Sequence, residues 1–304
     1  MSQRFAAIDT GTNTILMLIA EIDEDSGFKV VRDEHRIARL GEDLEKTGVI
    51  GTAAIRRACK IFDEYAQICR DENVNHIEIV CTSALRRARN SKEVITEFGK
   101  HIKADIKIIS GEEEAFLSFI GTVKDDSDST VIDIGGGSTE FIRGKGKNII
   151  IRKSVETGAV RCTERFIAAH PPSETTLYEI RKRIRSQLND ALDIMMGERL
   201  YAVAGTPVTI ASVLNGYKSF DEEVLNNFIL KKNDIEEVLS IFISNDLNYL
   251  INELGIHNRR ADVITAGTLI LLESLEALNT DSVVVSTKGL RYGLMKSINN
   301  KILV

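Results

Sequence analysis

Two short segments of this sequence carry the residue types that bind phosphate. Residues 9–14 read DTGTNT and residues 133–140 read DIGGGSTE; in both, an aspartate at the end of an apolar run precedes glycines and hydroxyl side chains. Glycine lets the backbone bring successive N–H groups close to an anion, and Ser or Thr adds further donors. One such turn is usually an ordinary hairpin, but two copies in matched surroundings favour a pair of opposed phosphate-binding loops.

The predicted phosphate ligands come from both segments. They are Asp9, Gly11, Thr12, Asn13, Gly135, Gly136, Gly137, Ser138 and Thr139. Only the second segment ends in a carboxylate. Hard cations such as Mg²⁺ prefer oxygen ligands and bridge to phosphate oxygens. We therefore expect Asp133 and Glu140 to bind a divalent cation at this loop. Asp9 is a candidate for a third ligand, and the alternative for Glu140 is an ordinary surface residue at a strand end.

Each loop must be held by the elements on either side of it. In the first half, the apolar runs 4–8 and 15–20 predict a hairpin, and a third strand is expected over 28–40. Apolar residues at helical spacing predict a helix over 52–71. In the second half, TVIDI and EFIRG flank the loop in the same way. The repetition indicates a duplicated α/β fold with the ligand in a cleft between its halves.

The rest of the chain alternates further strands and helices. Strands are expected over 76–82, 106–110, 148–156, 201–206 and 283–286. Helices are expected over 91–104, 111–124, 173–196, 261–278 and 289–300. Ser173 is the predicted N-cap of its helix. The polar stretch KDDSDS at 124–129 has no apolar residue and is the predicted linker between the halves.

The overall composition is that of a globular protein. The chain has 304 residues, 43% of them hydrophobic and 28% charged. Its net charge of −6 argues against wide binding of duplex nucleic acid. The N-terminal MSQRFAAID lacks the apolar run of a signal peptide, and no apolar stretch is long enough to span a membrane, so we expect a cytoplasmic protein. The four cysteines have no CxxC spacing and no histidine nearby in the sequence, which predicts buried free thiols and no structural metal.

A series of ordered motifs then extends through most of the chain. They are AAIDTGTNT (6–14), RLGEDL (39–44), TSALRRARN (82–90), ISGEEEA (109–115), VIDIGGGSTEF (131–141), ETGAVRCTERF (156–166), VAGTPVTIAS (203–212), RADVITAG (260–267) and STKGLRYGL (286–294). Together they resemble the exopolyphosphatase / guanosine pentaphosphate phosphohydrolase family. Paired Asp–Gly hairpins also resemble, more widely, the superfamily of actin, sugar kinases and heat-shock chaperone ATPases.

The resemblance implies a fold and a domain division. The expected fold is α/β, with two ribonuclease H-like (actin-like ATPase) domains separated by a cleft. Domain I would span 1–124 and be joined by the C-terminal helix at about 289–304, and domain II would span 125–288. Longer members of the family carry a C-terminal His-Asp metal motif. This sequence contains no His-Asp pair and resembles the short form.

The resemblance also implies an activity. We expect a hydrolase that uses Mg²⁺, or another divalent cation, to release terminal orthophosphate from inorganic polyphosphate. Conversion of guanosine pentaphosphate (pppGpp) to ppGpp, a reaction of the stringent response, is the second expected activity. The expected partners of a protein of this kind are its phosphate substrate and a second copy of the chain in a homodimer, with no duplex nucleic acid and no membrane.

Catalytic residues follow from the same resemblance. The family's catalytic glutamate corresponds to Glu114 in ISGEEEA, where it would accept a proton from the attacking water, with Glu113 as the alternative. Without that likeness, three glutamates in the first turn of a helix would be assigned to stabilising its dipole. Arg86 in TSALRRARN would stabilise the charge that develops on the transferred phosphate, and Asn90 of the same motif is a predicted phosphate ligand.

Two further motifs give weaker predictions. In AGTPVT, Gly205 and Thr206 are expected near phosphate, but Pro207 and Val208 depart from the small residue and the threonine that the family usually has there. Arg161 in TGAVRCTERF is a secondary candidate for the charge-stabilising role. Two other functions stay open: a sugar or acid kinase of the same superfamily, and a sensor that binds polyphosphate or (p)ppGpp without turnover.

Overall fold

The computed structural model describes residues 3–23, 27–189, 196–217 and 221–302. The chain divides into two compact units, one formed by Met1–Gly121 with Leu290–Val304 and the other by Thr122–Gly289. Each unit has its own mixed sheet, so the predicted α/β class is confirmed. The predicted linker 124–129 overlaps the first strand of the second unit, which already begins at Asp128.

The first unit is built on a five-stranded sheet of order β3-β2-β1-β4-β5. Its strands are β1 (Gln3–Thr10), β2 (Thr14–Asp23), β3 (Gly27–Ile37), β4 (His76–Cys81) and β5 (Asp105–Ile108). The hairpin β1–β2 and strand β3 pair antiparallel, whereas β1, β4 and β5 are parallel. The hairpin and third strand predicted from the apolar runs are therefore confirmed.

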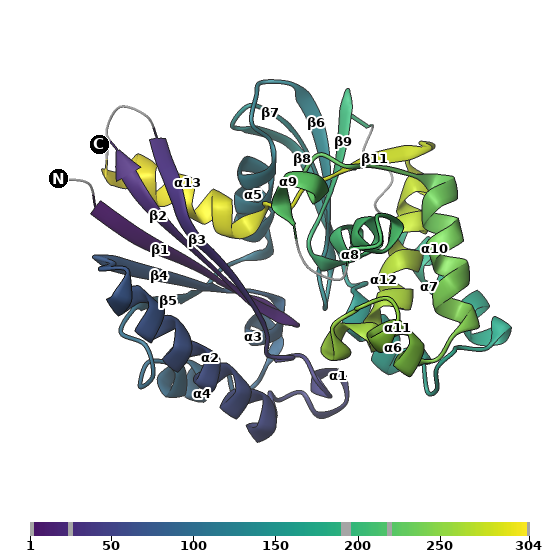
Figure 1. Cartoon of the computed structure of the whole chain (residues 1–304), viewed down its shortest axis with the longest axis horizontal. Helices are drawn as coiled ribbons and strands as arrows, with labels where there is room; N and C mark the ends of the chain where they lie inside the picture. The colour runs from purple at the N-terminus through teal and green to yellow at the C-terminus, as the bar shows by residue number, and fades with distance from the viewer. Residues whose placement is uncertain (1–2, 24–26, 190–195, 218–220, 303–304) are drawn as a thin grey trace. The chain divides into compact units, whose positions relative to one another are not determined.

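Helices cover both faces of this first sheet. Helices α2 (Thr52–Asp71) and α4 (Ser91–Phe98) lie on one face, and the C-terminal helix α13 (Leu290–Ile302) lies along β1, β2 and β3 on the other (Figure 1). Successive side chains of a strand point to opposite faces. Ile8 packs in the core beneath α2, so its neighbour Asp9 belongs to the face that α13 covers.

The second unit repeats the topology of the first. Its sheet has the order β10-β11-β9-β6-β7-β8. The strands are β6 (Asp128–Ile134), β7 (Thr139–Lys145), β8 (Asn148–Val155), β9 (Arg199–Val203), β10 (Ile229–Lys231) and β11 (Ser282–Val285). Strands β6, β7, β8, β9 and β11 take the places of β1 to β5, and β10 is an extra antiparallel edge strand. The duplicated fold inferred from the two loops is present in the strand order.

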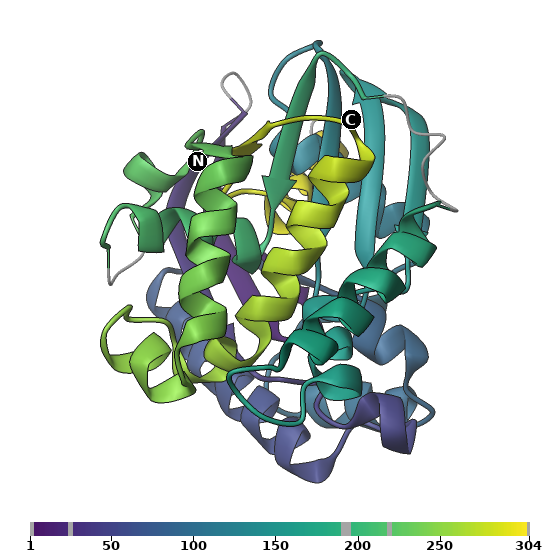
Figure 2. The same cartoon turned by 90° about the vertical axis from the view of Figure 1, so that its right-hand side faces the viewer.

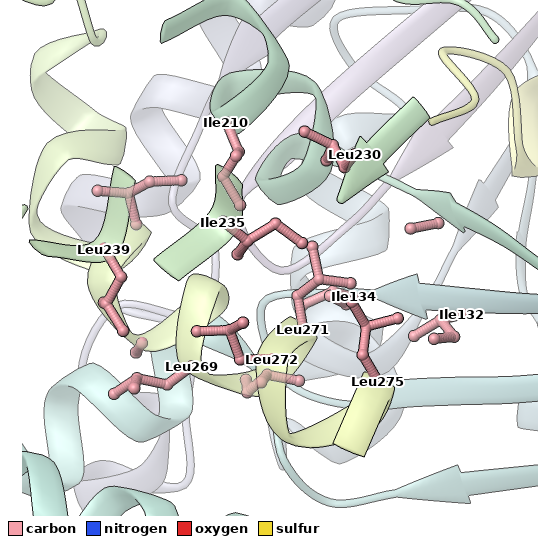
Figure 3. Packing of buried hydrophobic residues seen from close by; sticks show 14 of the residues in the cluster. Ile132, Ile134, Ile210, Leu230, Ile235, Leu239, Leu269, Leu271, Leu272 and Leu275 are labelled. Carbon is pink, nitrogen blue, oxygen red and sulfur yellow. The ribbon is translucent and has the colours of Figure 1, made fainter. Parts of the chain in front are cut away.

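One long helix forms the centre of the second unit's core. Helix α12 (Asn258–Ala277) lies between α7 (Glu174–Asn189) and α10 (Lys232–Ser244), as Figure 2 shows. Its side chains Leu271 and Leu275 pack toward Ile132 and Ile134 of β6 (Figure 3). Because Ile132 and Ile134 point into this core, Asp133 between them points to the opposite face of the sheet.

The remaining helices are short, and several were not predicted. They are α1 (Leu44–Thr47), α3 (Ser83–Arg87), α5 (Gly111–Thr122), α6 (Ala159–Phe166), α8 (Gly205–Leu214), α9 (Glu222–Leu225) and α11 (Leu247–Asn252). Ser173 accepts a hydrogen bond from the backbone N–H of Thr176 at 3.2 Å, which confirms it as the N-cap of α7. The predicted helix over 173–196 runs to Asn189, and residues 190–195 lie outside the described part of the chain.

Two expectations from composition can be compared with the structure. Cys59, Cys69, Cys81 and Cys162 are all buried free thiols, as predicted. Within the described ranges, no helix has the length and apolar character needed to cross a membrane.

A buried ion pair anchors the last helix to the first unit's sheet. Arg291 of α13 is 2% exposed and donates two hydrogen bonds of 2.8 Å to the two carboxylate oxygens of Asp33 on β3, 258 residues away in the sequence. The hydroxyl of Tyr292 also donates to Asp33, at 3.1 Å. A bidentate guanidinium–carboxylate pair fixes orientation as well as distance, so it positions α13 against the face that carries Asp9.

This anchor should make stability depend on pH. Burial alone would raise the pKa of Asp33, but the hydrogen bond with His35 and the charge of Arg291 hold it well below its ordinary value. A carboxyl with a depressed pKa stabilises the fold above its unfolded pKa of about 3.9, and the stabilisation is lost as pH falls through the folded pKa. We expect Asp33→Asn to lower the free energy of unfolding at about pH 7 by roughly 3 kcal/mol, because Arg291 loses its partner.

Urea unfolding at several pH values measures this effect. The difference between wild type and Asp33→Asn should shrink between about pH 5 and pH 3, as the wild-type carboxyl becomes protonated in the unfolded chain. Asp71→Asn is a control, because within the described part of the chain the Asp71 carboxylate accepts a hydrogen bond only from the exposed Gln67 side chain. A difference that stays constant down to about pH 3 would contradict the electrostatic explanation.

Candidate active site

The two Asp–Gly hairpins have the same strand register. Asp9 of β1 is paired with Leu16 of β2, and Asp133 of β6 is paired with Glu140 of β7. Residues directly opposite each other in antiparallel strands share a face of the sheet. Glu140 is therefore the structural counterpart of Leu16, and the second hairpin differs from the first by one buried carboxylate beside its aspartate.

Both loops also close with the same hydrogen bond. The N–H of Gly11 donates to the carbonyl of Thr14 at 2.9 Å, and the N–H of Gly135 donates to the carbonyl of Ser138 at 3.0 Å. A Cβ atom added to Gly11 or Gly135 would lie 3.2 or 3.0 Å from that same carbonyl oxygen. Each turn therefore leaves little room for a side chain at its first glycine, which explains why the two sequences share this residue.

Helix α6 is hydrogen-bonded to the backbone of the second loop. The N–H groups of Ala159 and Arg161 donate to the carbonyls of Gly135 and Gly136, each at 3.0 Å. In a trans peptide the carbonyl and the following N–H point in opposite directions. The N–H groups of Gly136 and Gly137 consequently point away from α6, and among the described residues neither donates a hydrogen bond. Two adjacent free N–H groups form an anion-binding nest.

The first loop is held by the segment that follows β3. The carbonyl of Asn13 accepts from the N–H groups of Ala38 and Arg39 at 3.0 and 2.9 Å, and the carbonyl of Thr12 accepts from Gly41 at 2.8 Å. The Oδ1 atom of Asn13 is buried, and no described residue donates to it. A buried acceptor without a protein donor is costly, so this atom is suited to a bound water or a ligand donor.

Each loop packs closely against a glycine whose role was not predicted. A Cβ on Gly41 would lie 2.2 Å from Cγ2 of Thr12, and a Cβ on Gly158 would lie 2.5 Å from the carbonyl carbon of Gly136. Backbone atoms therefore exclude any larger residue at Gly158, whereas a larger residue at Gly41 would require the Thr12 side chain to move. The two glycines fall within RLGEDL and ETGAVRCTERF, motifs that suggested a family but gave no reason for these glycines.

Burial distinguishes the three glutamates of ISGEEEA. Glu114 is 9% exposed, whereas Glu112 and Glu113 lie on the exposed side of α5. The Oε2 atom of Glu114 accepts a hydrogen bond of 2.9 Å from Nη1 of Arg86, and the same nitrogen donates to the carbonyl of Ile109 at 2.9 Å. The two predicted catalytic side chains are in direct contact, which favours Glu114 over Glu113.

The parallel strands of the first sheet bring these groups to one edge. The first loop follows β1, α3 with Arg86 follows β4, and α5 with Glu114 follows β5. Because β1, β4 and β5 are parallel, their carboxyl ends lie at the same edge of the sheet. Ligands of open α/β sheets bind outside the carboxyl ends of the strands. In the second unit the same argument places the glycine-rich loop after β6 and Gly205 after β9 at one edge.

The predicted metal ligands form a polar row across three strands. Asp133 on β6, Glu140 on β7 and Ser154 on β8 are paired in register and share one face. Glu140 is 2% exposed, and its Oε1 accepts a hydrogen bond of 2.8 Å from Oγ of Ser154. Two opposed carboxylates repel each other, and a divalent cation with oxygen ligands would relieve that repulsion. The residues present therefore fit a Mg²⁺ ion.

Two predicted phosphate ligands have structural partners. The side chain of Asn90 accepts from the N–H of Ile50 and donates to its carbonyl, both at 3.0 Å. The hydroxyl of Thr139 donates to the carbonyl of Thr157 at 2.6 Å, so its proton is not available to a phosphate oxygen. Asn90 holds the loop before α2, and Thr139 holds the end of β8 against β7.

Two other candidates are also involved in packing. The guanidinium of Arg161 donates to the carbonyl and the carboxylate of Glu156, at 2.8 and 2.9 Å. Thr206 is 6% exposed and lies against α12, where a Cβ on Gly267 would come within 2.3 Å of its hydroxyl oxygen. Gly267 thus permits close packing of α8 on α12 and positions Thr206.

An additional cation lies at the start of α8. Ala204 has φ 74° and ψ −166°, a region that is essentially restricted to glycine, and such strain often marks a functional site. A Cβ on Gly205 would lie 2.8 Å from the guanidinium of Arg260. Arg260 donates to the hydroxyl of Thr209 at 3.1 Å and has no carboxylate partner among the described residues. Desolvation lowers the pKa of Arg260, so a bound anion would stabilise its charge.

From the sequence, this arginine is one of an adjacent pair for which a solvated face is preferred to a local basic cleft for a polyanion. Arg259 and Arg260 are adjacent charged residues, and such pairs usually lie on a solvated helix face. Their position at the start of α12 could have indicated an anion site. A cation is unfavourable beside the positive end of the helix dipole unless an anion binds there.

Comparison with known proteins identifies the family. The profile described as the Ppx/GppA phosphatase family matches residues 18–302. A bifunctional 3-dehydroquinate synthase/phosphatase of Fusobacterium nucleatum is 32% identical over 97% of this chain, which spans 47% of that relative's length. Exopolyphosphatase 2 of Mycobacterium tuberculosis is 28% identical over 97% of this chain and 98% of its own.

A third relative and a solved structure agree with this result. The guanosine-5'-triphosphate,3'-diphosphate pyrophosphatase of Vibrio atlanticus is 28% identical over 95% of this chain and 58% of its own length. The crystal structure of an exopolyphosphatase from Cytophaga hutchinsonii superposes with a TM-score of 0.89 at 26% identity, covering 98% of both chains. This chain belongs to the Ppx/GppA phosphatase family.

Proposed function

We propose that this protein is a phosphoanhydride hydrolase that releases terminal orthophosphate from inorganic polyphosphate. The observation that carries the proposal is the buried carboxylate of Glu114 in contact with Arg86, at the sheet edge that also carries the first phosphate loop. Relatives named exopolyphosphatase and guanosine pentaphosphate pyrophosphatase support this reaction class and make pppGpp the second candidate substrate.

The proposed reaction is a displacement by water at the terminal phosphorus. Glu114 accepts a proton from water, the water oxygen bonds to phosphorus, and the bridging P–O bond breaks. The electron pair of that bond leaves with the shortened chain, and the other product is orthophosphate. Arg86 contacts Glu114 and would stabilise the negative charge that grows on the phosphoryl oxygens.

Backbone donors and one further cation would bind the substrate. The unused N–H groups of Gly136 and Gly137 suit phosphate oxygens, as does the first loop around Asn13. Arg260 is a further cation that suits a phosphate oxygen. Asp133 and Glu140 would hold Mg²⁺, which when bound neutralises phosphate charge. A cytoplasmic location and a homodimeric state remain predictions from the sequence.

Parallel assays of several substrates test the proposed function. Phosphate release should be measured with Mg²⁺ from long-chain polyphosphate, tripolyphosphate and pppGpp in parallel, and from ATP with and without small alcohol or acid acceptors. We expect turnover of long-chain polyphosphate with the highest kcat/KM. Turnover of ATP only when an acceptor is present, with no phosphate release from polyphosphate, would show a kinase. Tight polyphosphate binding without any phosphate release would show a sensor.

A further inference from the structure

A cluster of different metal-binding side chains lies between α2 and α4, apart from the phosphate loops. Cys59 of α2, Glu97 of α4 and His101 in the turn after α4 each contribute one ligand atom, and these atoms all lie within 4.8 Å of one another. His101 Nε2 is 3.8 Å from Oε1 of Glu97. Ligand atoms of a tetrahedral site with bonds of about 2.0–2.3 Å must lie roughly 3.3–3.8 Å apart, so small side-chain movements would close the cluster around one ion.

The imidazole is already oriented for binding. Its Nδ1 lies 2.9 Å from Oδ1 of Asp63, which is one helical turn after Cys59 on α2. With the Nδ1 proton donated to this carboxylate, the lone pair resides on Nε2, the nitrogen that faces Glu97. A carboxylate behind a histidine is the usual outer partner of a metal-bound imidazole, and it increases the ligand's basicity.

The remaining contacts hold the other two ligands without using their binding atoms. Lys100 donates to Oε2 of Glu97 at 2.6 Å, so Oε1 stays directed at the imidazole. Cys59 is 6% exposed and is fixed in the core of the unit. The rings of Phe62 and Phe98 pack 4.8 Å apart and lock α2 against α4. The two packed helices therefore position Cys59 and Glu97, and His101 follows α4 directly and is held by Asp63 of α2.

We propose that Cys59, Glu97 and His101 form a binding site for a transition-metal ion of the zinc class, oriented by Asp63. Thiolate and imidazole ligands select Zn²⁺ and similar ions over Mg²⁺, which takes oxygen ligands. Three protein ligands leave a fourth position for water. The ion would join α2 to α4 and stabilise the first unit. This site is independent of the proposed hydrolase function.

Cobalt spectroscopy tests the site directly. Co²⁺ replaces Zn²⁺ in tetrahedral sites, and a bound thiolate produces a ligand-to-metal charge-transfer band in the near ultraviolet. The full chain, in excess Mg²⁺ to occupy oxygen-ligand sites, should bind a single Co²⁺ with this band and with intense visible bands. Zn²⁺ should displace the Co²⁺ and raise the Tm of the protein.

Matched variants separate the site from the other thiols. Cys59→Ser and His101→Gln should lose the charge-transfer band and the Zn²⁺-dependent rise in Tm. Asp63→Asn should keep the band but weaken affinity by about 10–100-fold. Cys69→Ser is the control, because Cys69 is a buried thiol on the same helix that contacts Met17. Circular dichroism confirms that each variant is folded.

The outcomes either support or overturn the proposal. Loss of the band with Cys59→Ser and retention with Cys69→Ser support it. Absence of the band in the wild type, or its persistence in folded Cys59→Ser, overturns it and leaves His101 as an ordinary partner of Asp63 and Glu97.

Discussion

Replacing Glu114 with Gln should lower kcat for phosphate release by about 10²–10⁴-fold, the usual contribution of a positioned general base. Gln has nearly the same volume and can still accept a hydrogen bond from Arg86, but it cannot take a proton from water. Since the change removes an interaction made in the transition state, substrate affinity should change little. Initial rates with long-chain polyphosphate and equilibrium binding of the same substrate measure the two effects separately.

Glu113→Gln is the matched control for this prediction. Glu113 is the adjacent glutamate in α5, is exposed, and its backbone N–H bonds to Oγ of Ser110. Its replacement should change kcat by less than about threefold, as expected for a surface substitution. If Glu113→Gln is the slow variant and Glu114→Gln is not, the two roles must be exchanged. If both retain full activity, another group activates the water.

Local patterns were sufficient to predict the parts of the site that are continuous in sequence. Both hairpins, their glycines and their flanking strands follow from short-range chemistry, since an Asp at a strand end followed by Gly fixes a turn within a few residues. The repeated strand order agrees with the duplication that the two hairpins indicated, although a hairpin by itself fixes only its own two strands. The choice among the glutamates also agrees with burial, which leaves Glu114 as the protected one.

Contacts between distant segments could not be predicted in this way. Gly41 and Gly158 are small because of what packs against them, and nothing in their neighbouring residues shows this. Asn90 belongs to a motif that suggested phosphate binding, yet both ends of its side chain bond to the peptide of Ile50. The sequence likewise gave Cys59 no nearby histidine, whereas the packing of α4 on α2 brings His101 to it.

Replacing Glu140 with Gln should raise the Mg²⁺ concentration for half-maximal activity by about 10–100-fold, an effect of the size seen when the surroundings of a metal are altered. The carboxylate lies directly opposite Asp133, in the position that the other hairpin fills with Leu16. Gln keeps the shape and can accept the hydrogen bond from Ser154, so the folded hairpin should persist. Removing one of two opposed charges reduces attraction for a divalent cation and also relieves their repulsion, and these two effects can be measured separately.

Two measurements therefore accompany the activity assay. Mn²⁺ binding without substrate, followed by electron paramagnetic resonance, should weaken with Glu140→Gln, whereas thermal stability without metal should stay the same or rise. Asp128→Asn is the control from the same hairpin: Asp128 pairs with Arg143 at the far end of β6, so its loss should lower stability and leave Mn²⁺ binding unchanged. A metal requirement that is equal in wild type and Glu140→Gln would remove Glu140 from the ligands. The buried carboxylate would then need another reason to lie beside Asp133, and its hydrogen bond to Ser154 would make it a support for the strand pair.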